Sequence, residues 1–273
     1  CMRSKKFRYS LEVRLWNDGF GFRLLFDKNT GLLVADEPTQ FNVPGDTVCR
    51  YQTDLKKMQG KTLTKKTSAL PSGEIFSCMT AFEFPEKDIY TMITESDIEN
   101  YPGMALRSLG AGKFKVELWD TDKFFIKGRK TPWRIITVCR SLEELVRCRV
   151  ITHAAAPSSG KIYENAEWIR PGKSAWSYFI DEEHSRRFEK IMEFNALAEQ
   201  AGYEYNLADN GWRDWARTEH GAFKKVKELV DDAEKRSVGI WLWHSAMDRV
   251  WFAPYRRRFF KNCQRLGIKG IKL

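Results

Sequence analysis

Ile268-Lys269-Gly270-Ile271-Lys272-Leu273, at residues 268–273, has the composition of a short β-strand. Similar stretches begin near residues 175, 203 and 239. This spacing is roughly thirty residues, the length of a strand–helix–strand unit. Strands and helices that alternate in this way are typical of a parallel sheet. Residues 268–273 are therefore predicted to be the fourth strand of such a sheet.

Amphipathic helices are predicted between these strands, over residues 185–200, 221–236 and 251–266. In the first helix, apolar residues recur at helical spacing and form one face. Gly202 and Gly267 follow the first and third helices. Glycine commonly ends a helix because it adopts the left-handed backbone conformation without strain.

The turn after the first strand, which is predicted over residues 175–179, separates two possible parallel folds. An open doubly wound sheet usually carries a glycine-rich phosphate loop at this point. Here the turn is Ile-Asp-Glu-Glu-His at residues 180–184, without glycine. We therefore expect residues 156–273 to form the first four strands of a (β/α)8 barrel. The acidic residues 181–183 are interpreted as charges that complement the dipole of the following helix.

The N-terminal part, residues 1–155, has the alternation of β-strands instead. Residues 7–16 and 20–26 flank the turn signal Asn17-Asp18-Gly19 and predict a hairpin. Further strands are predicted over residues 74–84, 89–94, 114–119 and 133–139. Many short strands separated by Pro, Gly and Asn favour an antiparallel β-sandwich. Because strand alternation begins almost at Cys1, we expect this sandwich to lack its N-terminal start.

Composition limits the class of protein. The 273 residues are 42% apolar and 14% aromatic, which is ample for a core and argues against disorder. The net charge of +10 raises the question of nucleic acid, but the basic residues are dispersed and lie in no recognisable nucleic-acid module. The six cysteines show no zinc spacing and are interpreted as mostly free thiols. Neither a signal peptide nor a transmembrane run is recognised.

Motifs in the C-terminal part resemble those of one enzyme family. They are WIRPGKSAW at residues 168–176, LADNGW at 207–212 and KGIKL at 269–273. Together they resemble glycoside hydrolase family 97, a largely bacterial family of α-glucosidases and α-galactosidases. The N-terminal part resembles the same family independently, through NDGFGFR at 17–23, ITESD at 93–97 followed by YPGM at 101–104, and TPWR at 131–134.

The resemblance implies a fold and a location. The family's fold is an N-terminal β-sandwich, a (β/α)8 barrel and a small C-terminal β domain, so this chain is expected to hold most of the first and half of the second. The resemblance also implies that the full-length protein is periplasmic or secreted.

The resemblance further implies an oligosaccharide substrate and a calcium ion beside it, to which Glu95 contributes a carboxylate. Carboxylate oxygens suit calcium, a hard cation. Polar and aromatic residues at strand ends, where barrel enzymes place substrate contacts, are the candidate sugar-binding residues. They are Trp176, Asp209, Asn210, Trp212, His244 and Lys272. In the family's retaining members the nucleophile is an Asp that would follow Leu273, and the acid/base lies on a later strand. No catalytic residue is therefore expected within these residues.

Each candidate also has a structural interpretation. In this interpretation Glu95 is a surface residue at a strand end, Asp209 is a turn residue and Lys272 is a solvated cation. His244 is a buried polar group whose hydrogen bonds are satisfied. The tryptophans are core residues, and this is the favoured interpretation of Trp243. Two functions follow. The first is a calcium-dependent retaining α-glycosidase, present here as an incomplete and inactive chain; the second is a truncated, non-catalytic carbohydrate-binding protein.

Overall fold

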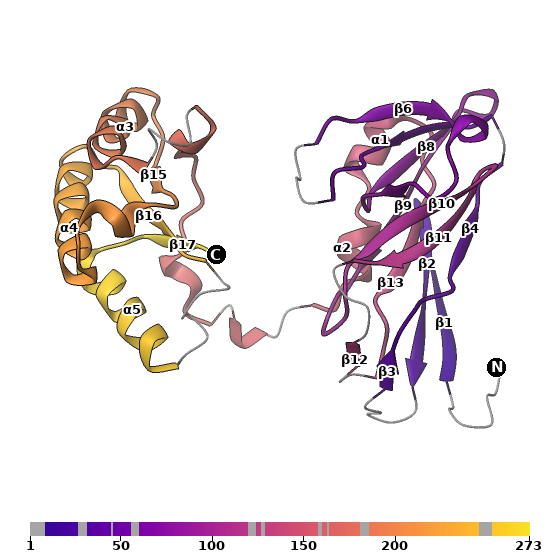
Figure 1. Ribbon diagram of the computed structural model, residues 1–273, viewed down its shortest axis with the longest axis horizontal. Helices are drawn as coiled ribbons and strands as arrows, with labels where there is room; N and C mark the ends of the chain where they lie inside the picture. Colours follow the sequence, from indigo (N-terminus) through magenta and orange to yellow (C-terminus); the bar gives the residue numbers. More distant parts are fainter. Residues whose placement is uncertain are drawn as a thin grey trace. The chain divides into compact units, whose positions relative to one another are not determined.

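The computed structural model divides the chain into two compact units, Cys1–Ser159 (unit 1) and Gly160–Leu273 (unit 2). It describes residues 9–26, 32–44, 46–55, 60–119, 124–126, 129–157, 160–162, 164–180, 186–245 and 253–273. Unit 1 is made chiefly of antiparallel sheets and unit 2 of a parallel sheet with helices (Figure 1). The predicted fold class, antiparallel sheets followed by an α/β part, is thus confirmed. Within the described residues, no helix is long and apolar enough to cross a membrane.

The larger sheet of unit 1 has seven strands in the order β1-β2-β13-β9-β8-β5-β6. Every pair in it is antiparallel. The strands are β1 (Tyr9–Trp16), β2 (Gly19–Phe26), β13 (Trp133–Thr137), β9 (Ile89–Ser96), β8 (Thr80–Phe84), β5 (Val48–Tyr51) and β6 (Leu63–Lys66). The expected hairpin at Asn17-Asp18 is present, since Trp16 pairs with Gly19 across that turn.

The smaller sheet has four strands in the order β4-β11-β10-β7, and a short pair joins β12 to β3. These strands are β4 (Gln40–Asn42), β11 (Lys113–Leu118), β10 (Met104–Gly110), β7 (Ile75–Phe76), β12 (Phe124–Ile126) and β3 (Leu32–Val34). Side chains of the two larger sheets form one core, which includes Phe76, Phe82, Leu106, Phe114 and Val116. Each of these five side chains is essentially excluded from solvent. Helices α1 (Leu142–Arg147) and α2 (Val150–Ala154) follow the last strand.

Two details of unit 1 differ from the sequence prediction. Residues 74–84, expected as one strand, form β7 and β8, which belong to different sheets. The backbone turns between them at Met79, whose φ of 71° lies in the left-handed region. Strand β10 was not predicted, although Met104, Leu106 and Ser108 on it are buried. Its pairing with β7 and β11 connects residues distant in sequence, which local alternation does not reveal.

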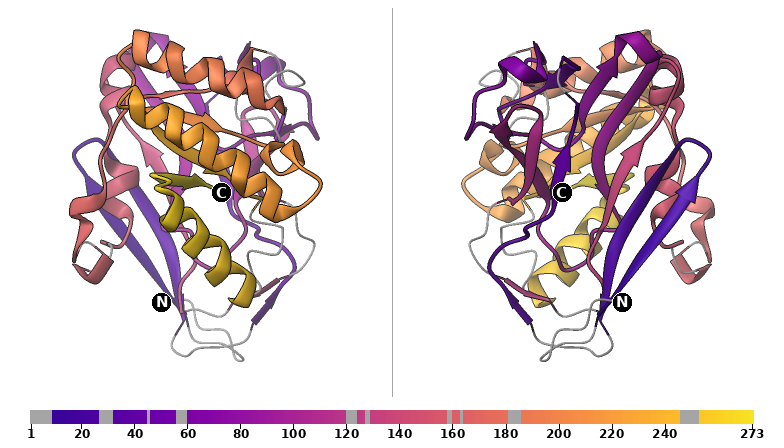
Figure 2. Two further views of the ribbon diagram at one scale, coloured as in Figure 1. Left: turned by 90° about the vertical axis from the view of Figure 1, so that its left-hand side faces the viewer. Right: turned by 90° about the vertical axis from the view of Figure 1, so that its right-hand side faces the viewer.

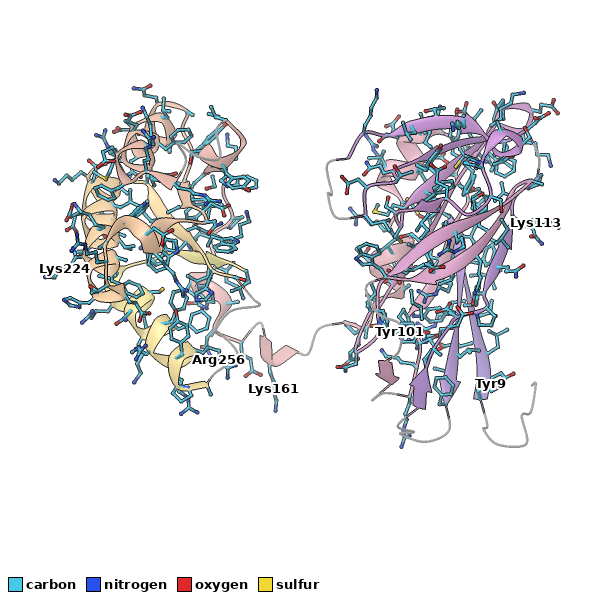
Figure 3. All side chains as sticks on the ribbon, in the orientation of Figure 1. Tyr9, Tyr101, Lys113, Lys161, Lys224 and Arg256 are labelled. Carbon is cyan, nitrogen blue, oxygen red and sulfur yellow. The ribbon has the colours of Figure 1, made fainter. Side chains whose placement is uncertain are left out.

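Unit 2 contains four parallel strands in the order β14-β15-β16-β17. They are β14 (Ser174–Ala175), β15 (Tyr205–Ala208), β16 (Gly239–Trp243) and β17 (Gly270–Lys272). Helices α3 (Phe188–Gln200), α4 (Glu219–Lys235) and α5 (Ala253–Leu266) connect successive strands. They lie along the same face of the sheet (Figure 1 and the left view of Figure 2), and Lys224 on the outer side of α4 points away from the strands (Figure 3).

This strand order is that of a barrel rather than of a doubly wound sheet. Each strand lies beside the next one in sequence, with no reversal of order. A doubly wound sheet reverses its order at a switch point and carries helices on both faces. Successive βα units that all turn the same way build a barrel wall. We therefore interpret the four strands as half of such a wall.

The predicted helix ends are also confirmed. Gly202 and Gly267 adopt φ angles of 64° and 78°. After α3, the amide of Tyr203 donates to the Ala198 carbonyl at 2.8 Å, which is the hydrogen bond of a glycine-terminated helix. The first strand, however, is shorter than expected: β14 ends at Ala175, and Ser177–Phe179 forms a 3₁₀ helix. Ser177, the first residue of this helix, is buried.

Candidate functional site

The candidate sugar-binding residues follow the carboxyl ends of the parallel strands of unit 2. Trp176 comes directly after β14, Asp209 and Asn210 after β15, and His244 after β16. Lys272 is the last residue of β17. In a parallel sheet these ends lie at the same edge, which is where barrel enzymes bind their substrates.

Three of these residues form one cluster. The Lys272 Nζ atom lies 2.7 Å from Oδ2 of Asp209 and 3.9 Å from the centroid of the Trp176 ring. Asp209 is buried, whereas the Lys272 side chain is 36% exposed. The Trp176 ring stacks on Tyr178, with centroids 5.9 Å apart and planes 16° apart. We call Trp176, Asp209 and Lys272 the strand-end cluster.

Asp209 is a turn residue whose carboxylate also binds Lys272. Its Oδ1 atom accepts a hydrogen bond from the Asn210 amide at 2.6 Å, as expected of a turn residue. Its other oxygen is the one that binds Lys272. The turn therefore orients the carboxylate toward the end of β17. Asn210 is half-buried and lines a neighbouring cavity.

His244 is held inside the protein. Only 1% of it is exposed, and its ring packs edge-on against Phe259 at 4.6 Å between centroids. Its Nδ1 atom lies 2.9 Å from the Ser245 carbonyl, which only accepts hydrogen bonds, so Nδ1 carries the proton. The Nε2 atom then accepts, and both Arg213 and the Tyr255 hydroxyl contact it. His244 thus behaves as a buried polar group with protein partners.

Trp212 lies in the core rather than on a binding surface. It is 2% exposed and packs on Phe223 and Phe259, at centroid distances of 5.3 and 6.5 Å. Its indole Nε1 donates to the Trp243 carbonyl at 2.8 Å. A sugar needs an exposed ring face on which to stack, and Trp212 has none. The structural interpretation therefore fits Trp212, whereas Trp176 is half-buried and remains a candidate.

A cavity of about 430 Å³ lies beside these residues. It is lined by Asn210, Gly211, Trp212, Arg213, Asp214, Trp243, His244 and Ser245. This volume is in the range of small-molecule sites. Arg213 lines the cavity, and its guanidinium lies 5.7 Å from the ring centroids of both Trp212 and Tyr255. The acidic residues 181–183, interpreted as charges that complement a helix dipole, lie outside the described residues.

In unit 1, Glu95 lies on β9 within a buried ion network. Its Oε2 atom accepts from Arg134 Nη1 and its Oε1 atom from the Met104 amide, both at 2.7 Å. Arg134 also donates two hydrogen bonds to Glu37, and the Tyr101 hydroxyl donates to Glu37 at 2.9 Å. The Arg134 and Glu95 side chains are 2% and 7% exposed. Glu95 is therefore not a surface residue.

The pKa values of the two carboxylates in this network are shifted in opposite directions. Burial raises the pKa of Glu95, and the Met104 amide and Arg134 only partly offset that effect. Burial also acts on Glu37, but the hydrogen bonds and charge of Arg134 outweigh it and lower its pKa. Arg134 binds Glu37 through two nitrogens but binds Glu95 through only one. Bidentate pairing of this kind is the stronger arrangement.

Comparison with known proteins identifies the family. The sequence profile described as "Glycosyl-hydrolase 97 N-terminal" matches residues 2–157. The chain belongs to glycoside hydrolase family 97. The family 97 chain is 26% identical over 280 residues to a probable retaining alpha-galactosidase of Streptomyces bingchenggensis, covering 97% of the chain and 42% of that protein. It is 24% identical over 323 residues to a retaining alpha-galactosidase of Bacteroides thetaiotaomicron, covering 100% of the chain and 47% of that protein.

Solved structures share the fold of the family 97 chain. A crystal structure of a beta-arabinopyranosidase superposes with a TM-score of 0.74 at 24% identity, over 96% of this chain and 46% of the other. A family 97 enzyme of Pseudoalteromonas in complex with acarbose superposes with a TM-score of 0.75 at 17% identity, over 96% and 44%. The chain spans less than half the length of these relatives.

The described residues of the family 97 chain do not by themselves fit a calcium ion. Among them, no group of three or more His, Cys, Asp or Glu side chains could hold a metal. Calcium takes six to eight oxygen ligands, and Glu95 offers one carboxylate that already binds Arg134. A calcium site would need further oxygen ligands from outside the described residues.

Sequence reasoning did not find Arg213, Asp214 and Tyr255. Arg213 and Asp214 lie on a short 3₁₀ helix, Trp212–Trp215, and Tyr255 lies in the first turn of α5. None of them directly follows a strand, so the strand-end pattern does not mark them. A weak signal for Arg213 was present, because it directly follows the motif at residues 207–212.

Proposed function

We propose that this chain is the N-terminal part of a retaining α-glycosidase that removes terminal α-linked glucose or galactose from oligosaccharides and depends on calcium. The observation that carries the proposal is the strand-end cluster, in a chain that belongs to family 97. Curated relatives are named retaining alpha-galactosidases, and solved family 97 structures contain acarbose and panose.

The cluster has the chemistry that a sugar requires. A hydroxyl both donates and accepts hydrogen bonds, so it can bind an ammonium and a carboxylate at once. Lys272 and Asp209 offer these groups 2.7 Å apart. The Trp176 ring already contacts Tyr178 and the Lys272 ammonium, and in this proposal the part of the half-buried ring that stays exposed packs against the C–H face of a sugar. The cation–π contact of the Lys272 ammonium with the Trp176 ring helps to hold the ammonium in place.

The catalytic carboxyl groups belong, in this proposal, to residues beyond the chain. A retaining mechanism needs a nucleophile and an acid/base about 5–5.5 Å apart. We place the nucleophile directly after Leu273, at the end of β17, and the acid/base on a later barrel strand. Lys272 would then stand next to the nucleophile, at the same edge as Trp176 and Asp209. The 273 residues would bind sugar without cleaving it.

The 273-residue chain is expected to bind methyl α-galactoside or methyl α-glucoside weakly and to leave nitrophenyl α-glycosides intact. Binding is measured by saturation-transfer NMR and hydrolysis by release of nitrophenol. Trp176→Ala and Lys272→Met should each reduce the transfer signal, because they remove the stacking face and the ammonium. Trp168→Ala is the matched control, since Trp168 is 73% exposed and lies outside the cluster.

Two outcomes would contradict this assignment. Turnover that persists after host glycosidases are removed would place the catalytic groups inside the chain. A signal that Trp176→Ala and Lys272→Met leave unchanged would remove the strand-end cluster from the binding site. Sugar binding by a longer natural polypeptide that shows no turnover would favour the alternative, a non-catalytic carbohydrate-binding protein.

Calcium dependence is tested in a natural polypeptide that continues beyond Leu273. Glu95→Gln is expected to weaken calcium binding and lower hydrolysis together, because one ion would serve both. The affinity is measured by titration calorimetry and the rate in the same buffers. Glu99→Gln is the control, since the Glu99 side chain is 69% exposed. Equal calcium affinity in the Glu95→Gln variant and the parent would exclude Glu95 as a ligand.

A further inference from the structure

Cys139 and Cys148 meet at one backbone group of unit 1. The Asp18 carbonyl, in the turn between β1 and β2, accepts a hydrogen bond from the Val138 amide at 2.8 Å. The Cys148 thiol donates to the same oxygen at 3.9 Å. Cys139 directly follows Val138, and its thiol is a hydrogen-bond partner of the Cys148 thiol. Both cysteines are free thiols in the structure, and we call them the thiol pair.

Cys139 is fixed on the seven-stranded sheet. It follows β13 and pairs with Tyr90 of β9 as an isolated antiparallel bridge. The Tyr90 amide donates to the Cys139 carbonyl at 2.8 Å, and the Cys139 amide donates to the Tyr90 carbonyl at 2.9 Å. Only 3% of Cys139 is exposed. Its backbone therefore keeps one position relative to β9, and its thiol stays inside the protein.

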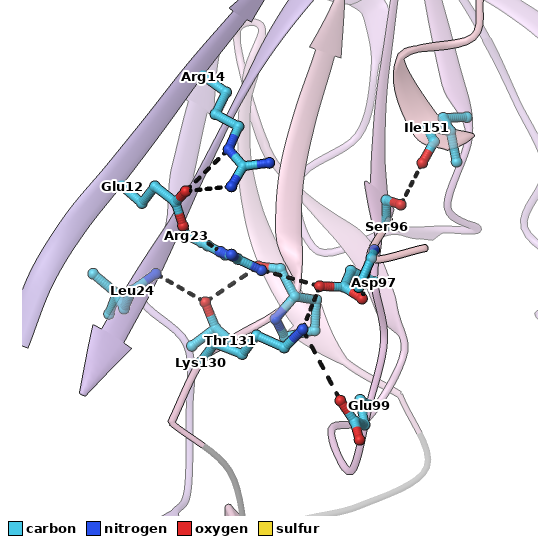
Figure 4. A network of polar contacts seen from close by, with 12 residues as sticks. Glu12, Arg14, Arg23, Leu24, Ser96, Asp97, Glu99, Lys130, Thr131 and Ile151 are labelled. Atoms are coloured by element: carbon cyan, nitrogen blue, oxygen red, sulfur yellow. Dashed lines mark hydrogen bonds and ion pairs between the residues drawn. The ribbon is translucent and has the colours of Figure 1, made fainter. Parts of the chain in front are cut away.

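Cys148 is held by the two helices that flank it. It caps the end of α1, where its amide donates to the Leu145 carbonyl at 3.3 Å, and it packs against the core cluster to which α2 contributes. Helix α2 is tied to β9 in turn, because the Ser96 hydroxyl donates to the Ile151 carbonyl at 2.5 Å (Figure 4). Contacts with the same strand thus position both members of the thiol pair.

The helix between the two cysteines is held only weakly by packing. Helix α1 has six residues, and none of them is buried. Leu142 and Val146 are 48% and 85% exposed. Hydrogen bonds hold the start of the helix: the Glu144 amide donates to the Ser141 hydroxyl at 3.1 Å, and the Glu144 carboxylate accepts from the Arg140 amide at 2.7 Å. Because so short a helix is marginal in water by itself, a covalent link across it would restrain it.

The thiol pair is reached through Cys148. This residue is half-buried, whereas Cys139 is buried. A cavity of about 470 Å³ adjoins Cys148 and is lined by Asp18, Ser141, Glu143, Glu144, Arg147 and Cys148 itself. A small disulfide molecule that enters this cavity meets the Cys148 sulfur first.

We propose that Cys139 and Cys148 form an intramolecular disulfide, which restrains α1, when the chain meets a disulfide oxidant such as oxidised glutathione. The Cys148 thiolate attacks one sulfur of the oxidant, which forms a mixed disulfide and releases one glutathione thiolate. The Cys139 thiolate then attacks the Cys148 sulfur and releases the second. The two cysteines lose two electrons and two protons, and the glutathione disulfide is reduced to two thiols that take up those protons.

A metal site is a weaker interpretation of the thiol pair. Zinc bound by cysteines takes four ligands. Among the described residues, no group of three or more His, Cys, Asp or Glu side chains could hold an ion. Two thiols in contact need no further group to form a disulfide, and the approach that is required is small, since the bond is about 2.05 Å long.

The surroundings of the thiol pair favour a disulfide that resists reduction. Burial raises the pKa of the Cys148 thiol to about 12. Burial also raises the pKa of Cys139, and the charges of Asp18 and Glu144 act in the same direction. Disulfides that are strong oxidants come from dithiols whose reduced form is stabilised, and the thiolates of this pair are disfavoured instead. We therefore expect the disulfide to persist in a glutathione mixture.

The experiment incubates the folded 273-residue chain with equal amounts of oxidised and reduced glutathione until the products no longer change. Remaining thiols are blocked with N-ethylmaleimide, and the unreduced tryptic peptides are analysed by mass spectrometry. Trypsin cleaves after Arg140 and Arg147, so the two cysteines fall on separate peptides unless a disulfide joins them. The joined peptides should be the main form of both cysteines and should disappear after treatment with dithiothreitol.

Cysteine variants provide the controls. Cys139→Ser and Cys148→Ser should each lack the joined peptides. Cys78→Ser is the matched control, because Cys78 is also half-buried and its thiol contacts the Thr94 hydroxyl at 3.5 Å. It should form the Cys139–Cys148 link as the parent does. Circular dichroism checks that each variant keeps its sheets.

The effect on α1 is measured by scanning calorimetry. The disulfide closes a loop of about ten residues in the unfolded chain, so the thermal midpoint of unit 1 should rise by about 5–10 °C on oxidation. The same glutathione treatment should leave the midpoint of the Cys148→Ser variant unchanged, because no loop is closed in it.

Four results would overturn the proposal. They are a parent chain that keeps both thiols, a glutathione mixed disulfide that remains on Cys148, a link that forms only after urea has unfolded the chain, and an oxidised chain whose midpoint equals that of the reduced chain. The first three would show that the fold does not bring the two sulfurs together, and the last that the link does not restrain α1.

Discussion

Arg134→Met is expected to destabilise unit 1 by about 3–5 kcal/mol, the range found when one partner of a buried ion pair is removed. The substitution leaves the Glu37 and Glu95 carboxylates without their cation, and their side chains are 12% and 7% exposed. The free energy of unfolding is measured by urea titration, with tryptophan fluorescence reporting on Trp133, which neighbours Arg134 on β13.

Two further variants show whether the effect comes from the unpaired charges. Arg50→Met removes a more exposed pair with Glu83 and should cost about 1 kcal/mol or less. Adding Glu37→Gln and Glu95→Gln to Arg134→Met removes both charges and should recover most of the loss. If Arg134→Met costs no more than Arg50→Met, or if the triple variant recovers nothing, unpaired buried charge is not the cause.

The same network should impose a pH dependence on unit 1. The pKa of Glu37 lies below its ordinary value of 4.5, so its contribution to stability is present above that value and is lost as the pH falls through the folded pKa. The pKa of Glu95 is raised, so its contribution has the opposite sign and is lost as the pH rises through its folded pKa. Glu37→Gln should therefore flatten the acid limb of the stability profile.

Trp212→Ala is expected to destabilise unit 2 by about 3–5 kcal/mol, as large-to-small substitutions of buried aromatic residues do. The indole is 2% exposed, packs against two phenylalanines and donates one hydrogen bond. Trp176→Ala should cost less stability, because Trp176 is only half-buried, yet it should reduce sugar binding more. Both quantities are measured on the same preparations, by urea unfolding and by saturation-transfer NMR.

Trp168→Ala serves again as the control and should change stability by about 0.5 kcal/mol or less, as exposed substitutions do. The decisive comparison is between Trp212→Ala and Trp176→Ala, since Trp212 is assigned to the core and Trp176 to sugar binding. If Trp212→Ala kept the stability of unit 2 and abolished sugar binding, Trp212 would be the stacking residue and its core role would be wrong.

The order of elements in unit 2 was predictable because its signals are local. Helix α4 buries residues three or four apart, namely Ala222, Phe223, Val226, Leu229, Val230 and Ala233, and this spacing is visible in the sequence. The glycine stops at 202 and 267 are single-residue signals. Parallel strands also bring their carboxyl ends together, so Trp176, Asp209 and Lys272 could be grouped before any distance was known.

The pairing of β7, β8 and β10 in unit 1 was less predictable. Residues 74–84 alternate as one strand would, but they form two strands, β7 and β8, which belong to different sheets. That choice depends on contacts with strands distant in the chain, such as Leu106 with Phe76. Local alternation carries information about which side chains point inward and little about which strand lies beside them.

The sequence by itself determined the alternation of strands and helices, the helix ends and the family to which the chain belongs, because each depends on neighbouring residues or on short motifs. Only the tertiary structure decided which tryptophan is core and which remains available at the strand ends, since Trp176 and Trp212 both follow parallel strands. It also decided that Arg134 binds Glu37, 97 residues away, as well as Glu95. Burial and ion pairing are properties of segments brought together by folding, and the order of residues along the chain does not contain them locally.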